Sequence, residues 1–190
     1  EPSGAVIEVC SNVAASIGQL HQKVLLIDGD LRRPTISRVF GAHQKPGITE
    51  DLESGQGSIH PGYKTKYANL SVLPRGMSEQ NPSNLLAPDR LARVIASLRD
   101  TYDVIIIDTP PLSACSDALL WGSQADGAAM VISPLGWDGE VEARYKQQLV
   151  DHGVPVFGAI LNGAQGAESH GYGYGYGYGR GKGYGNYGDR

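Results

Sequence analysis

Two apolar runs in the sequence each lead into aspartate. Residues 24–27 read Val-Leu-Leu-Ile and continue into Asp28, Gly29 and Asp30, and residues 104–107 read Val-Ile-Ile-Ile and continue into Asp108. Carboxylates at the ends of buried strands lose hydration and repel one another unless a cation faces them. Mg²⁺ accepts such oxygen ligands and usually binds one or two carboxylates together with phosphate oxygens. The pattern therefore predicts phosphate chemistry assisted by a metal ion. A single aspartate after a strand, such as Asp117 or Asp126, is more often a helix cap or a turn residue.

Short apolar runs and helical patterns alternate along the chain. Strands are predicted at Val24–Asp28, Leu70–Pro74, Val104–Asp108, Gly127–Ser133 and Val156–Leu161. Two helices are predicted from apolar residues at helical spacing, one through Val9, Val13, Ile17 and Leu20 and the other through Leu91, Val94, Ile95 and Leu98. A third, more polar helix is predicted over Glu140–His152. The segment from Gln44 to Tyr67 is predicted to hold loops and a short helix.

The predicted strands indicate how the acidic residues are positioned. Four of the five runs are almost continuously apolar, which is typical of strands buried on both faces of a parallel sheet. Strands that alternate with helices predict an α/β, doubly wound, mostly parallel sheet. Such sheets bind ligands beyond the carboxyl ends of their strands, where Asp28, Asp30 and Asp108 lie.

Composition excludes several classes of protein. The chain has 190 residues, of which 41% are hydrophobic, so one domain is expected. A net charge of −4 argues against a surface devoted to nucleic acid. Two cysteines, Cys10 and Cys115, are too few for a disulfide scaffold. No apolar run approaches the ~18 residues of a membrane span. The sequence does not begin with Met and is expected to be part of a longer protein.

The C-terminal segment differs in composition from the rest. From Gly171 to Gly188 glycine alternates with tyrosine, and no aliphatic side chain is present to form a core. A folded domain over residues 1–164 and a flexible, disordered tail over residues 165–190 are therefore expected. Glycine and tyrosine repeats also occur in self-associating or RNA-contacting segments, but three cations are too few for strong phosphate-backbone binding. The tail tyrosines are Tyr172, Tyr174, Tyr176, Tyr178, Tyr184 and Tyr187.

Several of these motifs together resemble one family. Four apolar residues followed by Asp-x-Asp-x-Arg (Asp28 to Arg32) resemble the second Walker motif of the bacterial tyrosine kinases, and Ile107-Asp108-Thr109-Pro110-Pro111 resembles their Walker B motif. Asn162 at the end of Gly158–Asn162, the Pro82–Leu86 segment and the tyrosine-rich ending are similar to the same family. Residues 9–163 thus resemble the cytoplasmic autokinase domain of capsule or exopolysaccharide biosynthesis proteins, with a P-loop ATPase (MinD/ParA-like) fold.

The resemblance implies a role for each matching residue. Asp28 would assist deprotonation of the incoming tyrosine hydroxyl, Asp30 and Asp108 would hold Mg²⁺ partly through water, and Arg32 would organise phosphate or a neighbouring subunit. ATP would be the phosphate donor, with Ser3 and Gly4 near its phosphates and Asn162 at its adenine edge. Phosphoryl transfer depends mainly on positioning and charge neutralisation, which these residue types supply. The tail tyrosines would be the phosphate acceptors.

The resemblance also implies partners and a location. The family's domain forms a ring-type homo-oligomer and acts with a membrane-embedded activator region of a polysaccharide export system and with a tyrosine phosphatase, at the inner face of the cell membrane. No nucleic-acid partner is expected. Because each phosphate adds about −1.5 to −2 charges, a phosphorylated tail would oppose assembly by repulsion.

The beginning of the chain departs from the family pattern. Counted back from Asn12, the Walker A lysine position falls on Val6 and the Ser/Thr position on Ile7, so only Pro2, Ser3 and Gly4 resemble the phosphate-binding turn. Val and Ile supply neither the cation nor the Mg²⁺-ligating hydroxyl of a phosphate loop. Two structures remain possible: Ala5–Val9 begins the helix, which the apolar spacing favours, or Ala5–Val9 forms a strand.

Three functions remain open from the sequence. The first is a tyrosine autokinase that uses ATP and Mg²⁺. The second is a catalytically impaired pseudokinase that accepts phosphate or acts as a scaffold, because a missing phosphate-binding lysine costs at least about a hundredfold in rate. The third is a septum-site or partition-type ATPase switch, in which the tyrosine tail has no role. Lys23, Lys64 and Lys66 are the candidates to replace the missing lysine.

Overall fold

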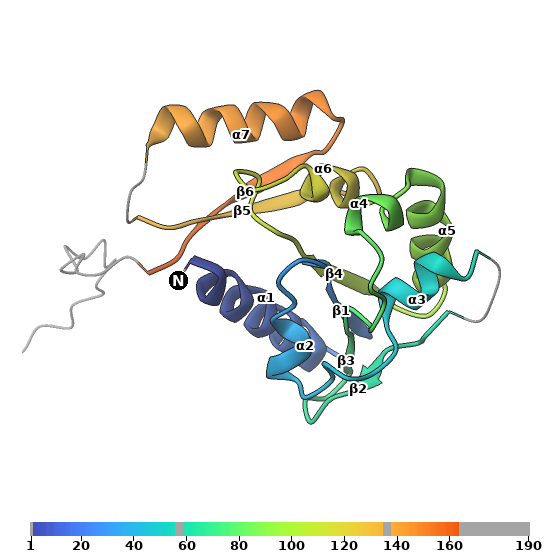
Figure 1. The fold of residues 1–190 in the computed structure, drawn as a ribbon. Coiled ribbons are helices and arrows are strands. Elements are labelled where there is room, and N and C mark those ends of the chain that lie inside the picture. Colours follow the sequence, from blue (N-terminus) through green and yellow to red (C-terminus); the bar gives the residue numbers. More distant parts are fainter. Residues whose placement is uncertain (1, 56–58, 135–137, 164–190) are drawn as a thin grey trace, which may run out of the picture.

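The computed structural model describes residues 2–55, 59–134 and 138–163, with side chains from Val6 onward. The elements, in chain order, are α1 (Pro2–Gln19), β1 (Val24–Asp28), α2 (Ile36–Val39), α3 (Ile48–Glu53), β2 (Tyr63–Lys64), β3 (Leu70–Leu73), α4 (Pro82–Leu85), α5 (Pro88–Arg99), β4 (Val104–Asp108), α6 (Asp117–Gly122), β5 (Ala128–Ile132), α7 (Gly139–Asp151) and β6 (Val156–Leu161) (Figure 1). The α/β class predicted from the sequence is confirmed. The predicted tail, with its six tyrosines, lies outside the described residues.

The strands form two sheets. One has the order β2-β3-β1-β4, in which β3, β1 and β4 are parallel and the two-residue strand β2 is antiparallel. The other is the parallel pair β5-β6. The sequence predicted one continuous sheet, but the structure has no ladder between β4 and β5 in the described residues. The sequence also gave no sign of β2, because two residues are too short for a recognisable alternation.

Strand β1 is the centre of the larger sheet, and both of its faces are buried. Leu25 and Ile27 point into one hydrophobic cluster, and Val24 and Leu26 point into the other. Successive side chains of a strand alternate between its two faces, so a continuous apolar run is what a strand covered on both sides requires. This confirms the interpretation of the sequence in which residues 24–28 form an interior strand.

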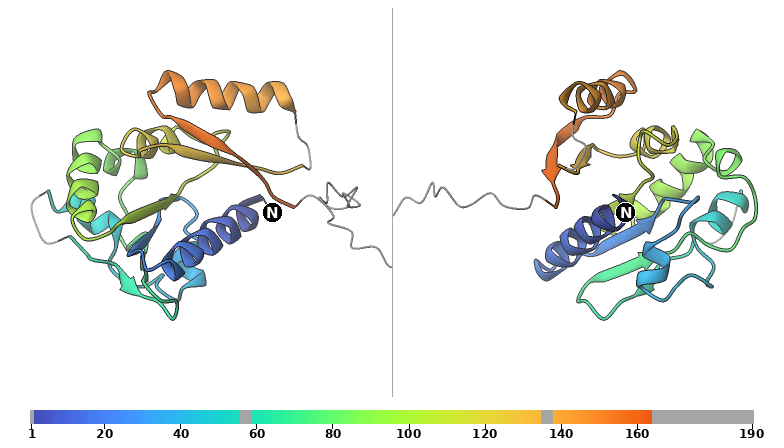
Figure 2. Two further views of the ribbon diagram at one scale, coloured as in Figure 1. Left: turned by 180° about the vertical axis from the view of Figure 1, so that it is seen from behind. Right: turned by 60° about the vertical axis from the view of Figure 1, so that its left-hand side comes forward.

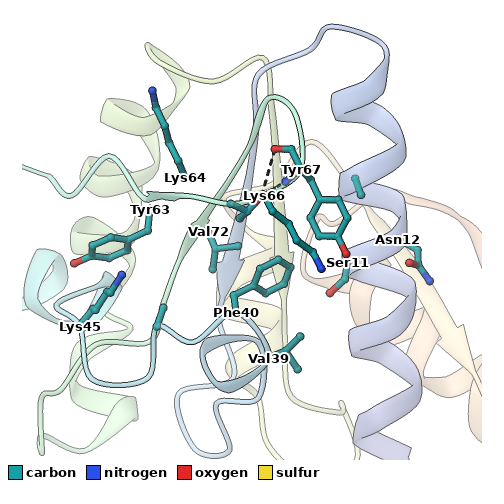
Figure 3. Close-up of a pocket in the computed structure, with 13 residues that line it drawn as sticks. Ser11, Asn12, Val39, Phe40, Lys45, Tyr63, Lys64, Lys66, Tyr67 and Val72 are labelled. Atoms are coloured by element: carbon teal, nitrogen blue, oxygen red, sulfur yellow. Dashed lines mark hydrogen bonds between the residues drawn. The ribbon is translucent and has the colours of Figure 1, made fainter.

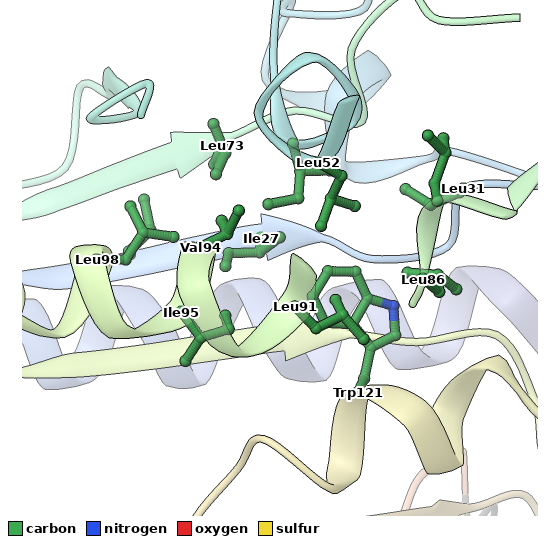
Figure 4. Packing of buried hydrophobic residues seen from close by; sticks show 13 residues of the cluster. Ile27, Leu31, Leu52, Leu73, Leu86, Leu91, Val94, Ile95, Leu98 and Trp121 are labelled. Carbon is green, nitrogen blue, oxygen red and sulfur yellow. The ribbon is translucent and has the colours of Figure 1, made fainter. Parts of the chain in front are cut away.

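Helices cover the two faces of this sheet (Figure 2). Helix α5 presents Leu91, Val94, Ile95 and Leu98, at the spacing of one helical face, to the cluster that also contains Trp121 (Figure 4). Helix α1 packs on the opposite face through Ile7 and Ala14. Since Ala5–Val9 lies within α1, the helical alternative for this segment is confirmed and the strand alternative is wrong.

Candidate functional site at the strand ends

Asp28 is fully buried at the carboxyl end of β1. Its Oδ2 accepts hydrogen bonds from the Ser37 backbone N–H, at 2.7 Å, and from the Ser37 hydroxyl. Its Oδ1 is buried and has no hydrogen-bond partner. Burial raises the pKa of Asp28 to about 6, although the two Ser37 hydrogen bonds act in the opposite direction. An oxygen in this state is a candidate ligand or proton acceptor.

Asp108 lies beside Asp28 because β1 and β4 are paired in register, with Asp28 opposite Asp108. Burial, together with the negative charges of Asp28 and Asp30, raises the pKa of Asp108 to about 7. The Cys10 thiol on α1 approaches Asp108 Oδ1 at 3.8 Å. The three carboxylates are thus close enough to influence one another, as the sequence predicted, and a cation would relieve their repulsion.

Asp30 belongs to the loop after β1. Its Oδ1 accepts hydrogen bonds from the backbone N–H groups of Arg32, at 3.1 Å, and Arg33, at 2.9 Å, which fixes the turn. No group of three or more His, Cys, Asp or Glu side chains among the described residues is placed to hold a metal ion. The protein alone therefore does not form a complete metal cage here. Asp30 and Asp108 as a pair of Mg²⁺ ligands, completed by phosphate and water, stay a prediction.

Arg32 binds a different carboxylate from the ones at the strand ends. Its Nε donates to Asp117 Oδ2 at 2.8 Å, and one terminal nitrogen donates to Asp117 Oδ1 at 3.2 Å and to the Ser83 hydroxyl at 3.1 Å. Asp117 is buried, and its carboxylate raises the pKa of the Arg32 guanidinium further. This bidentate pair connects the loop after β1 to the start of α6. The hydrogen bond to Ser83 connects the same loop to α4, whose N-cap is Asn81. The predicted role of Arg32 toward phosphate stays a prediction.

Replacing Arg32 with alanine is expected to destabilise the folded chain by about 1–2 kcal/mol, because the change leaves the buried Asp117 carboxylate without a cation. The Arg32 guanidinium is partly exposed, so the expected loss is smaller than for a fully buried pair. The double variant Arg32→Ala/Asp117→Asn should recover part of the loss. Urea unfolding of the parent, both single variants and the double variant measures the coupling between the two side chains. Additive single effects would contradict this assignment.

The structure adds residues that the sequence did not indicate. The Ser37 hydroxyl accepts a hydrogen bond from the Arg75 backbone N–H at 2.9 Å, and the Arg75 guanidinium donates to the Leu31 carbonyl at 2.9 Å. The positive charge of Arg75 lowers the pKa of Asp28, although burial outweighs it. Arg75 lies two residues after the end of β3. Because ligands in such sheets bind beyond the carboxyl ends of the strands, this position could have identified Arg75 as a candidate site residue. Ser37 does not directly follow a strand, so its place in the sequence gave no comparable indication of a role in the site.

A groove with a volume of about 810 Å³ connects several predicted site residues. Asp30, Asp108 and Asn162 all line it, and Asn162 also donates its backbone N–H to the Ile132 carbonyl at 2.9 Å. Ser3 and Gly4 lie in the first turn of α1, and their side chains are outside the described set. The groove thus brings together the carboxylates and the asparagine, which are about 50 or more residues apart in the sequence.

The positions that would hold phosphate carry aliphatic side chains. Val6 lines the groove and Ile7 is buried, and both lie within α1. None of the three candidate replacement lysines lies at the carboxyl ends of β1 and β4. Lys23 precedes β1 and so lies at its opposite end, and its carbonyl accepts from the Asp103 backbone N–H at 2.9 Å.

Lys64 and Lys66 line a separate hollow of about 510 Å³ beside β2 and β3 (Figure 3). Lys64 lies opposite Ser71, which in turn pairs with Leu25, three residues before Asp28. Lys66 extends toward the Tyr67 ring, with its Nζ 5.3 Å from the ring centre, whereas Lys64 points away (Figure 3). None of these three lysines is therefore placed to replace the one missing at Val6.

Comparison with known proteins identifies the family. The chain is 38% identical over 180 residues to the tyrosine-protein kinase wzc of Salmonella typhimurium, covering 90% of this chain and 24% of that protein. It is 34% identical over 153 residues to the tyrosine-protein kinase YwqD of Bacillus subtilis, covering 80% of this chain and 65% of that protein. The kinase domain of VpsO is 34% identical, with a TM-score of 0.74 over 80% of this chain and 75% of that one. The chain belongs to the bacterial tyrosine kinase family.

Further neighbours of this bacterial tyrosine kinase domain agree with the predicted fold. The kinase domain of Escherichia coli ETK matches with a TM-score of 0.77 and 35% identity over 88% of this chain and 66% of that one. The cell division ATPase MinD of Pyrococcus furiosus matches with a TM-score of 0.71 and 26% identity over 85% of this chain and 67% of that one. No family model matches the sequence. The chain spans about a quarter of the length of the wzc relatives. Within the described residues, no helix combines the length and apolarity that crossing a bilayer demands.

Proposed function

We propose that this chain is the domain of a protein-tyrosine autokinase that transfers phosphate from ATP to tyrosines of its own tail, within a protein that regulates capsule or exopolysaccharide polymerisation and export. The observation that carries the proposal is the pairing of two buried carboxylates, Asp28 and Asp108, on adjacent strand ends, with Asp108 lining the groove that Asn162 also lines. Membership of the bacterial tyrosine kinase family supplies the reaction class.

Each carboxylate has a role that fits its surroundings. Asp28 accepts the proton that the tyrosine hydroxyl loses as its oxygen bonds to the γ-phosphorus of ATP and ADP leaves. Its buried, unpartnered Oδ1 is the acceptor atom. Asp30 and Asp108 would hold Mg²⁺, which would supply positive charge against the phosphates. Asn162 faces the adenine. The mutual repulsion of the carboxylates fits a bound divalent ion.

The end of the site that would bind the phosphates of ATP matches the proposed autokinase function less well. Val6 and Ile7 supply neither a cation nor a hydroxyl, and they lie in a helix. This observation favours a second candidate function, in which the domain binds nucleotide weakly or not at all and its tail is phosphorylated by an active relative. The third possibility, an ATPase switch of the septum-site or partition type, assigns no role to the tyrosine tail and is disfavoured by the tyrosine kinase relatives.

Incubation with γ-labelled ATP and Mg²⁺, followed by phosphotyrosine mapping, separates these functions. An autokinase is expected to label the tail tyrosines, and the label is expected to fall at least about a hundredfold in Asp28→Asn and in Asp108→Asn. Asp100→Asn, which alters an exposed carboxylate at the end of α5, is the matched control and should retain full labelling. Labelling only by an added active relative would establish the acceptor function. Nucleotide-dependent dimerisation without label would indicate the ATPase switch.

The proposal extends to assembly and location. The domain forms a ring-type homo-oligomer at the inner face of the cell membrane, where a membrane-embedded region activates it and a tyrosine phosphatase reverses tail phosphorylation. Because successive phosphates make the tail strongly anionic, phosphorylation disperses the ring. Size measurement of the phosphorylated and unphosphorylated protein tests this assembly step, and identical oligomers would refute it.

A further inference from the structure

The hollow of about 510 Å³ beside β2 and β3 is separate from the groove at the strand ends. Among the described residues the two share no lining residue. Ser11 and Asn12 of α1 line the hollow, whereas Cys10 and Val13, on another side of the same helix, line the groove. The volume of the hollow lies within the range of about 300–1,000 Å³ that is usual for small-molecule sites. The hollow is therefore a second candidate binding site.

The charged side chains that line the hollow are all positive. Lys45, Lys64 and Lys66 contribute to the lining, and no Asp or Glu of the described chain does, although the whole chain has a net charge of −4. Every ion pair in the described residues involves an arginine or a histidine, so these lysines have no carboxylate partner there. Lys64 points away from the other two (Figure 3). Lys45 and Lys66 are thus cations available to an anionic ligand.

Each of these two lysines lies beside an aromatic ring of the same hollow. Lys45 Nζ is 4.4 Å from the centre of the Tyr63 ring, and Lys66 Nζ is 5.3 Å from the centre of the Tyr67 ring. Phe40 also lines the hollow and lies between the two lysine–tyrosine pairs in the view of Figure 3. Aromatic surface next to a cation suits a ligand that combines aromatic rings with negative charge.

The Ser11 hydroxyl adds a hydrogen-bond donor to this hollow. Its oxygen is buried and has no hydrogen-bond partner, and Ser11 lies in the wall that α1 contributes. A buried hydroxyl without a partner costs free energy, so it gains a hydrogen bond if it turns toward an acceptor in the hollow. Phosphate oxygens are strong acceptors of such bonds. The donor and the lysines together favour a phosphate group as the anion.

The tail of this chain acquires the required chemistry when its tyrosines are phosphorylated. Each phosphate adds about −1.5 to −2 charges to an aromatic side chain. Tyrosine occupies every second position from Tyr172 to Tyr178, with glycine between. In an extended peptide, side chains two residues apart point to the same side at a spacing of roughly 7 Å. Such a segment can therefore present two phosphotyrosines to the two lysine–tyrosine pairs.

We propose that the hollow beside β2 and β3 binds phosphotyrosines of the tail, with Lys45 and Lys66 contacting the phosphates and the aromatic side chains of the hollow contacting the rings. Because the tail belongs to the same chain, its effective concentration at the hollow is high. Only the origin of the phosphates rests on the proposed autokinase function. The binding itself depends on the hollow alone.

Binding of synthetic tail peptides to the unphosphorylated full chain tests the proposal. One fluorescent peptide spans residues 171–179 with phosphate on Tyr174 and Tyr176, and the matched control peptide has no phosphate. Fluorescence anisotropy gives both dissociation constants. The phosphorylated peptide is expected to bind at least about tenfold more tightly, because charge-assisted hydrogen bonds require the phosphates. Equal affinity of the two peptides would overturn the proposal.

Variants of the two lysines show where the phosphopeptide binds. Lys45→Gln and Lys66→Gln are each expected to weaken its binding at least about fivefold, because each removes a cation from a phosphate. Lys146→Gln, which alters an exposed lysine of α7 outside the hollow, is the matched control and should bind as the parent does. Unchanged affinity in both hollow variants would place the peptide elsewhere and contradict the proposal.

Two further outcomes separate this inference from its alternatives. If ATP displaces the phosphopeptide and the ATP affinity falls in Lys45→Gln and Lys66→Gln, the hollow is a nucleotide site and the assignment to phosphotyrosine is wrong. The peptide is phosphorylated before use, so its binding does not require kinase activity. Lysine-dependent binding by a chain that does not label its own tail would support this inference and refute the autokinase function. Labelling of the tail without such binding would do the reverse.

Discussion

Replacing Gly29 with alanine is expected to destabilise the folded chain by about 3 kcal/mol, because there is no space for a side chain between Asp28 and Asp30. A Cβ at Gly29 would lie 2.5 Å from the Asp108 carbonyl oxygen and 2.8 Å from Ile107 Cγ2. The carbonyl belongs to the β4 ladder and cannot move without disturbing the pairing that places Asp108. The Gly29 carbonyl also accepts the Trp121 indole N–H at 3.0 Å, so the change affects the packing of α6 as well.

Gly158→Ala is the matched control for this variant. Gly158 lies in β6, and a Cβ added there would meet no atom within 4 Å. Urea unfolding followed by circular dichroism should show a lower midpoint for Gly29→Ala and an unchanged or slightly higher one for Gly158→Ala. Equal midpoints for Gly29→Ala and the parent chain would show that the loop between the two aspartates is not held tightly against β4.

The free energy of unfolding is expected to fall as the pH rises from 5 to 8 in the absence of divalent ions. Asp28 and Asp108 have folded pKa values of about 6 and about 7, above the ordinary value of 3.8. A carboxyl group whose pKa is raised by folding stabilises the folded state fully below its unfolded pKa, and this contribution is lost as the pH rises through the folded pKa. The loss attributed to Asp108 is on the order of 2–4 kcal/mol.

The variant Asp108→Asn tests this pH dependence. The amide has nearly the same shape and carries no charge, so the variant should be more stable than the parent at pH 8 and similar to it at pH 5. Asp100→Asn changes an exposed carboxylate and should follow the parent at both pH values. Mg²⁺ at pH 8 should stabilise the parent and leave Asp108→Asn unchanged. A parent chain that gains stability between pH 5 and pH 8 would exclude the raised pKa values as the dominant effect.

The interior of the fold could be predicted from the sequence because its signal is local. The apolar runs at 24–27 and 104–107 mark two strands, of which β1 is fully buried and β4 is half-buried, and parallel pairing then brings Asp28 and Asp108 to the same edge of the sheet. The helical spacing in α5 was equally plain. These features depend on hydrophobic periodicity, which a single sequence displays directly.

Other features depend on contacts between distant residues, and the sequence does not display them. Arg32 and Asp117 are 85 positions apart, and nothing in either motif indicates that they form a bidentate pair. Ser37, in the short helix α2, was also missed, because in a sequence a serine with a buried carboxylate partner resembles any other serine. The sequence also did not show that β4 and β5 belong to separate sheets. Apolar patterns identify strands, but they do not determine which strands are neighbours.

The burial of β1 has a consequence for the internal motions of the domain. Its backbone is paired on both edges and its side chains belong to two cores, so local opening of Asp28 requires both cores to separate. Asn162 follows β6, which within the described residues pairs with β5 alone, and Phe157 of β6 is 73% exposed. Segments with few buried contacts open at low free energy, and central strands open last. Asp28, beneath the acidic end of the groove, and Asn162, which lines the groove, therefore belong to parts of different rigidity, so the acidic end is fixed and the end at Asn162 can adjust to what binds there.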